Sequence, residues 1–160
     1  MEQTNEEQIV VSRTFDAPLE LLWKAWTDPE EFKKWYGPKN FTTPVCEIDL
    51  KVGGKHLYGM RSPDGMEMFT TGTYLEIAPM ERLVYSDSMS DAMGNERTAE
   101  VMEKMGMPAG KAPSMDVTVA FEHADGKTTV TISHAGSGEG GKQAGMGWEQ
   151  ALEKLEATLA

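Results

Sequence analysis

The chain has 160 residues, of which 39% are hydrophobic and 26% are charged, as in an ordinary globular protein of one domain. Its 15 Lys and Arg against 26 Asp and Glu give a formal charge of −11, which repels phosphate backbones and disfavours nucleic-acid binding. No apolar run approaches the roughly 20 residues of a membrane span. The polar start, 1–8, predicts a disordered tail rather than a signal peptide, and the lone Cys46 cannot form an intramolecular disulfide. We therefore expect a cytoplasmic protein without membrane insertion.

One strand and two short helices are predicted at the start of the chain. Residues 9–15 are rich in β-branched side chains, which is typical of a strand. Asp16 as the cap and Pro18 in the first turn indicate a helix, whose apolar residues then recur at helical spacing. Asp28 followed by Pro29 indicates the start of a second helix.

A run of strands follows, separated by turn residues. Ser62-Pro63-Asp64-Gly65 has proline second and glycine fourth, which fits a type I turn. The predicted strands cover 45–50, 55–61, 68–77, 82–89, 116–122 and 127–134. With the first strand they make a mostly antiparallel meander of about seven strands.

A long connection, residues 90–114, separates two of these strands. A connection of this length in a compact domain is usually functional or carries its own helix. This region is rich in methionine, which recurs on promiscuous binding surfaces. We therefore predict a lid-like insertion, with gap-filling beneath a loop as the plainer alternative.

The last predicted element is a long helix, residues 142–159. Its apolar residues form one stripe, which consists of Trp148, Leu152, Leu155 and Leu159. Lys154 falls off this stripe and should face water. Ala144, Gly145 and Gly147 leave little side chain in the first half of the helix. They allow close backbone approach or leave room for a ligand, unless they only mark a frayed helix start.

One predicted strand carries an unusual polar face. Period two places His56, Tyr58 and Met60 on the same side of this strand. Lys55 and Arg61 occupy the other side and belong in water, so the first three side chains should point inward, toward the terminal helix. A buried imidazole and phenol need hydrogen-bond partners, which a cavity with water or a ligand supplies. The pattern predicts a small-molecule cavity, with ordinary core packing as the alternative.

Further aromatic side chains are candidates to border this cavity. They are Trp35, Phe41, Phe69, Tyr85 and Trp148. Phe69 and Tyr74, five residues apart, cannot both point inward on a regular strand. The three histidines are not at metal-ligand spacing, and no phosphate-binding or nucleophile motif is present. We predict no metal, no cofactor and no catalytic residue, and we favour a role other than that of an enzyme.

Several stretches resemble a known family over about residues 8–160. The order of strand, two helices, six strands and long helix resembles the helix-grip fold of START-like (SRPBCC) domains. The stretches FDAPLELLWKAWTDPEEFKKWYGP, CEIDLKVGGKHLYGMRSPDG, GTYLEIAPMERLVYSDS and GMGWEQALEKLEATL resemble the bacterial family named for homology to the activator of the heat-shock-protein-90 ATPase.

The resemblance implies the fold and a binding cavity. The fold is α+β, with a curved antiparallel sheet of about six to seven strands around a long C-terminal helix and two short helices after the first strand. We expect a single START-like domain over residues 1–160. In START-like domains the cavity between sheet and helix binds lipids, hormones or polyketides. We therefore predict a binding protein for a lipid-like or aromatic hydrophobic metabolite.

Two other functions follow from the resemblance. The family name implies a chaperone-linked co-regulator or protein-interaction module, with a chaperone or a second copy as partner. Eukaryotic co-chaperones of that name carry an additional N-terminal domain, whereas about eight residues precede the first predicted strand here. The other alternative is a cyclase or hydrolase that uses the same cavity, with His56 or a tyrosine as the acid–base group.

Overall fold

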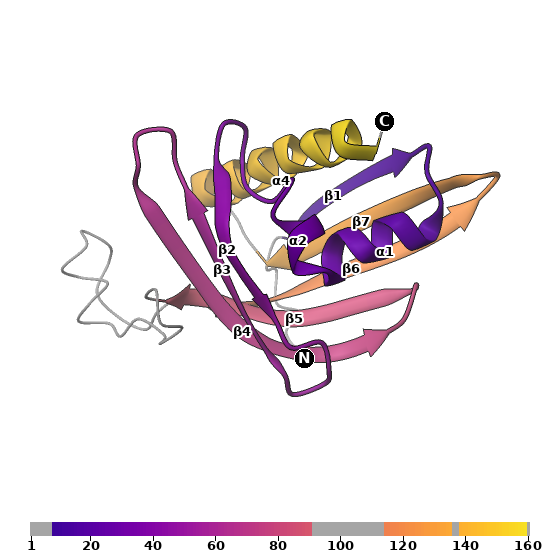
Figure 1. Cartoon of the computed structure of the whole chain (residues 1–160), viewed down its shortest axis with the longest axis horizontal. Helices are drawn as coiled ribbons and strands as arrows, with labels where there is room; N and C mark the ends of the chain where they lie inside the picture. Colours follow the sequence, from indigo (N-terminus) through magenta and orange to yellow (C-terminus); the bar gives the residue numbers. More distant parts are fainter. Residues whose placement is uncertain (1–7, 91–113, 136–137, 160) are drawn as a thin grey trace.

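The computed structural model describes residues 8–90, 114–135 and 138–159, which form one curled antiparallel sheet with helices on its concave face (Figure 1). The strands are β1 (Gln8–Phe15), β2 (Thr42–Ile48), β3 (Lys55–Arg61), β4 (Glu67–Ala78), β5 (Arg82–Ser90), β6 (Ser114–Ala124) and β7 (Lys127–Ala135). The helices are α1 (Leu19–Thr27), α2 (Pro29–Phe32) and α4 (Gly138–Leu159). The strand order is β1-β7-β6-β5-β4-β3-β2.

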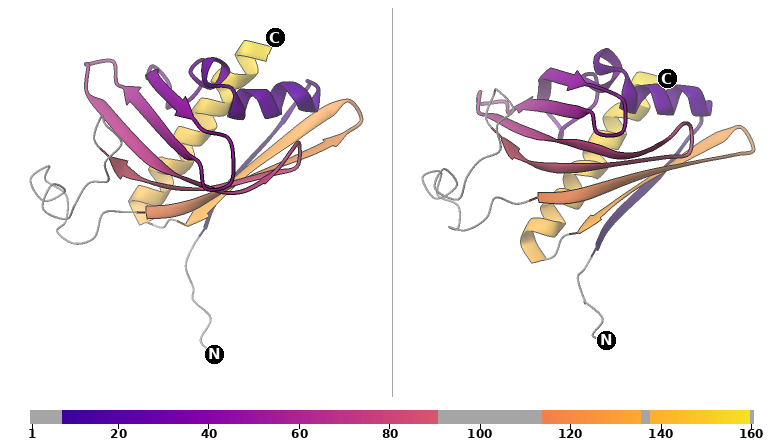
Figure 2. Two further views of the ribbon diagram at one scale, coloured as in Figure 1. Left: turned by 60° about the horizontal axis from the view of Figure 1, so that its bottom comes forward. Right: turned by 90° about the horizontal axis from the view of Figure 1, so that it is seen from below.

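This architecture confirms the predicted α+β helix-grip fold. All seven predicted strands are present at close to the predicted bounds, and α4 runs obliquely along the concave side of the sheet (Figure 2). The predicted lid, residues 90–114, and the predicted tail, residues 1–8, lie almost wholly outside the described residues. None of the described helices is both long and apolar enough to cross a membrane.

Local sequence signals explain most turns and caps, with one correction. The amide of Gly65 donates to the carbonyl of Ser62 at 2.9 Å, and its φ of +93° is a conformation that favours glycine. The Oδ1 of Asp28 accepts from the amide of Glu30 at 2.9 Å and caps α2 as predicted. The predicted cap at Asp16 is wrong, because the extended Pro18 directly precedes α1 and no side chain caps this helix.

The core lies between the concave face of the sheet and the helices. The second half of α4 contributes Leu152 and Leu155, which are 0% and 1% exposed. Beneath α1 and α2 the core is aromatic, and Trp26 and Trp35 meet edge to face with ring centroids 4.6 Å apart. The Nε1 of Trp35 donates to the carbonyl of Ala25 at 3.1 Å, which ties the segment after α2 to α1.

A lysine joins α4 to the segment that follows α2. The prediction that Lys154 faces water is wrong. Its ammonium group donates to the carbonyls of Pro38 and Phe41, both at 3.1 Å, and burial lowers its pKa. These bonds hold the segment that contains Tyr36 beside the helix, which positions one wall of the site described next.

Candidate functional site

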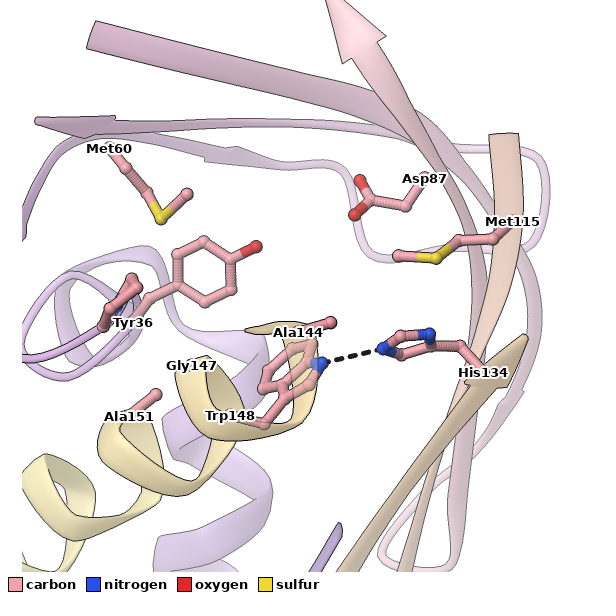
Figure 3. A pocket seen from close by; sticks show the side chains of 11 residues that line it. Tyr36, Met60, Asp87, Met115, His134, Ala144, Gly147, Trp148 and Ala151 are labelled. Atoms are coloured by element: carbon pink, nitrogen blue, oxygen red, sulfur yellow. Dashed lines mark hydrogen bonds between the residues drawn. The ribbon is translucent and has the colours of Figure 1, made fainter. Parts of the chain in front are cut away.

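A pocket of about 220 Å³ opens between the first half of α4 and the concave face of the sheet (Figure 3). Its lining is mainly apolar and comes from both ends of the chain. The lining residues are Tyr36, Gly37, Pro38, Met60, Asp87, Met115, His134, Ala144, Gly147, Trp148 and Ala151. The cavity therefore lies where the sequence predicted one, between sheet and terminal helix.

Small residues on α4 leave the space open. Ala144, Gly147 and Ala151 are spaced so that they share one face of the helix, and together they present no more than two methyl groups. A Cβ added to Gly147 would lie 3.6 Å from the Cγ of Pro38, and one added to Gly145 would lie 3.7 Å from the Cγ2 of Ile9. Both are ordinary contacts, so close backbone approach does not require either glycine, and α4 begins before both.

Asp87 brings a charged group to this apolar pocket. It lies on β5 two residues after Tyr85, so both side chains point to the concave face. Asp87 is only 8% exposed, yet its carboxyl group points into the pocket, and its Oδ1 has no hydrogen-bond partner among the described residues (Figure 3). Burial raises the pKa of this carboxyl from 3.8 to about 7, although the nearby Thr70 hydroxyl acts in the opposite direction.

His56 lies beside Asp87 but remains neutral. Its Nε2 lies 2.8 Å from the carbonyl of Ser86, which assigns the proton to Nε2, and 3.9 Å from the Oδ1 of Asp87. Burial lowers the pKa of His56 to about 4, with the bond to Ser86 opposing this shift. The ring fits here because residue 72 is glycine: an added Cβ would lie 2.8 Å from Nε2 and would collide with the Ser86 carbonyl. At neutral pH the imidazole therefore does not balance the charge of Asp87.

A second polar pair closes the other side of the pocket. The Nε1 of Trp148 donates to the Nε2 of His134 at 3.0 Å (Figure 3). The Nδ1 of His134 donates to the carbonyl of Ala135 at 2.8 Å, so both ring nitrogens are occupied. This pair fixes Trp148 as a wall of the pocket and leaves His134 without a free nitrogen. Among the described residues no three His, Cys, Asp or Glu side chains are grouped to hold a metal ion.

The predicted site residues divide between pocket and core. Met60 and Trp148 line the pocket. His56, Tyr58 and Tyr85 point inward as expected but belong to the buried core next to Asp87. Tyr58 does not face the terminal helix: its ring stacks on Phe32 of α2, with centroids 4.4 Å apart, because α2 covers this end of the sheet.

The other three predicted residues lie away from the pocket lining. Trp35 is fully buried among aromatic rings, and Phe41 is half-buried after the turn that follows α2. Phe69 pairs with Gly59 and lies over it on the face of the sheet opposite Tyr58. Tyr74 points inward, so the prediction that Phe69 and Tyr74 face opposite sides is confirmed.

The sequence carried weak signals for the residues that were missed. Asp87 and His134 each continue the inward alternation of a predicted strand, after Tyr85 and Ile132 respectively. A charged or polar residue at an inward position is itself a signal for a site. Tyr36 had no such signal, because its place on the wall depends on how the segment after α2 packs against α4.

A curled antiparallel sheet that grips a long helix, with a pocket between them, defines a START-like helix-grip protein. The family model described as "Activator of Hsp90 ATPase homolog 1-like protein" matches residues 16–160, and the chain belongs to this family. A search of curated proteins found no significant match.

Solved structures from bacteria share the fold. A crystal structure of a protein from Chromobacterium violaceum is 27% identical with a TM-score of 0.77, and the match covers 95% of this chain and 96% of that one. A solution structure from Staphylococcus epidermidis is 26% identical with a TM-score of 0.75, covering 98% and 92%. The AHSA1 protein from Silicibacter pomeroyi, at 18% identity and a TM-score of 0.70, covers 96% and 97% and supports the fold alone.

Proposed function

We propose that this protein binds a small hydrophobic molecule in the pocket between the sheet and α4. The observation that carries the proposal is an apolar pocket of about 220 Å³, kept open by small residues on a helix whose second half packs into the core. Apolar concave sites with a few polar groups are the usual form of small-molecule sites.

The volume favours an aromatic metabolite over a lipid. An apolar cavity of about 150 Å³ holds benzene, whereas drug-sized ligands occupy about 300–1,000 Å³. A pocket of about 220 Å³ therefore suits one ring with a short substituent. Met60 and Met115 line it with flexible thioethers, which adapt to ligands of differing shape.

The test compares two leucine variants of neighbouring helical glycines. Indole is titrated into the protein, and binding is followed by amide chemical shifts and by the thermal midpoint. Wild type and Gly145→Leu, whose new side chain starts toward Ile9, should bind, whereas Gly147→Leu should lose binding because its side chain starts from the pocket wall. Equal binding by all three proteins, or no binding of indole and other one-ring probes to wild type, would overturn the proposal.

An acid–base enzyme is the second candidate, favoured by the raised pKa of Asp87 at the pocket wall. His56 and the tyrosines are poorer candidates, because burial lowers the pKa of His56 to about 4 and raises those of Tyr58 and Tyr85 well above 10. Incubation with a metabolite extract, followed by mass spectrometry, tests this: products made by wild type but not by Asp87→Asn would support it. A chaperone or a second copy as partner stays a prediction.

A further inference from the structure

We propose that the pocket selects a small hydrophobic amine, whose ammonium group binds the carboxylate of Asp87. The inference rests on the proposed function, because it assigns the chemical class of the ligand to the same pocket.

The position of the carboxyl group carries the inference. Asp87 is more than nine-tenths buried, and Figure 3 shows its carboxyl group pointing into the space between Met60 and Met115. The Oδ1 has no hydrogen-bond partner among the described residues. A buried carboxylate oxygen without a partner is costly, and an ammonium N–H from a ligand supplies both the missing bond and the opposite charge.

The described groups around Asp87 do not supply a positive charge to balance its carboxylate. Among the described residues that line the pocket there is no lysine or arginine. The imidazole of His56 on β3 is neutral near pH 7, and the histidine on β7, His134, already has both ring nitrogens bonded. The other described titratable groups that interact with Asp87 are the phenols of Tyr36, Tyr74 and Tyr85, whose pKa values burial raises. These phenols are neutral at physiological pH, so Asp87 is the charged group of the described lining.

The negative charge of Asp87 also disfavours ligands that carry a carboxylate of their own. A fatty acid or aromatic acid would bring its own carboxylate next to Asp87 with no cation in the described lining to separate them. An amine of the same size is attracted instead. The net charge of −11 favours the approach of cations further.

Three ligands of matched size test the inference at pH 8: 2-phenylethylamine, 2-phenylethanol and phenylacetate. Isothermal titration of the full chain should show the amine bound at least about tenfold more tightly than the alcohol, since bonds to a charged partner are the stronger ones, and phenylacetate should bind weakest. Asp87→Asn keeps the shape of the side chain and should remove this preference, because the charge that attracts the ammonium group is lost.

A pH series on wild type gives a second readout that does not depend on the variant. Because the pKa of Asp87 is about 7, protonation should weaken amine binding by roughly tenfold between pH 8 and pH 6, with a smaller change for the alcohol. Equal affinities for amine and alcohol at pH 8, or an amine preference that persists in Asp87→Asn, would overturn the inference while the pocket's binding function stands. Failure of indole and all three ligands to bind would overturn the proposed function, and the inference with it.

Discussion

The two halves of α4 lie on the same sheet and differ in how completely they fill the space between the helix and the sheet. Beyond Ala151, which still borders the pocket, the second half fills its space: Leu152 and Leu155 are no more than 1% exposed. The first half presents Ala144 and Gly147 to the sheet and leaves a pocket there (Figure 3). One helix thus stabilises the fold with its second half and borders the pocket with its first.

This division predicts that the stability of the fold and the proposed ligand binding can be changed separately. Because core side chains are close-packed, a deletion in the second half leaves a cavity that the surrounding structure cannot fill. A larger side chain in the first half of α4, by contrast, enters the pocket, which is already empty. The following predictions test the difference between the halves, beginning with the largest expected effect.

Leu152→Ala should destabilise the protein by about 2–5 kcal/mol, because it removes a fully buried side chain from the packed half of α4. Urea unfolding followed by circular dichroism measures the change. Glu153→Ala, at the exposed neighbouring position, is the control and should stay within about 0.5 kcal/mol. A loss below about 1 kcal/mol for Leu152→Ala would mean that this half is loosely packed.

Asp87→Asn should stabilise the protein at pH 8 by up to about 4 kcal/mol, because it removes a buried charge whose pKa is raised from 3.8 to about 7. With the pKa raised, the folded state holds the proton more tightly than the unfolded state. This carboxyl therefore makes the stability of wild type fall as pH rises from about 4 to 7. The variant lacks the carboxyl and should not show this fall. Urea unfolding of both proteins between pH 5 and pH 8 measures the difference, and unchanged stability at pH 8 would contradict the raised pKa.

His56 acts in the opposite direction over an overlapping range. Its pKa is lowered from 6.5 to about 4, so the unfolded state takes up the proton first and stability falls as pH drops from about 6.5 to 4. In wild type the two slopes oppose each other. The histidine contribution is present in both proteins and cancels in their difference, so the variant's advantage over wild type should shrink from pH 8 to pH 5 only because Asp87 takes up its proton. The stability of Asp87→Asn itself should fall as the pH drops below about 6.5, since the histidine slope is no longer opposed.

Gly147→Ala should stabilise the protein by about 0.5–1 kcal/mol, because alanine is the better helix former and the new Cβ meets Pro38 at an ordinary contact distance. Gly145→Ala is the matched control, and thermal unfolding should show a similar gain. The two should differ in indole binding, which only the alanine at the pocket wall weakens. Destabilisation by Gly147→Ala would show that the first half of α4 is closely packed after all.

Prediction from sequence worked where the signal is local. Period-two alternation placed Met60 on the concave face, and turn chemistry placed Gly65 at the tight turn between β3 and β4. It failed where a side chain has a local preference and a stronger distant partner. Lys154 belongs in water by its helical position, yet three backbone carbonyls of a segment more than 100 residues earlier hold it.

The sequence by itself determined the strands, the turns, the apolar stripe of α4 and the family, because each follows from the order of neighbouring residues. The tertiary structure alone decided which inward residues meet at the pocket. Met60, Asp87 and His134 come from β3, β5 and β7, and they converge because the sheet curls around one helix. The volume of the pocket between them depends on side chains that are distant in the sequence, so it cannot be predicted from any local pattern.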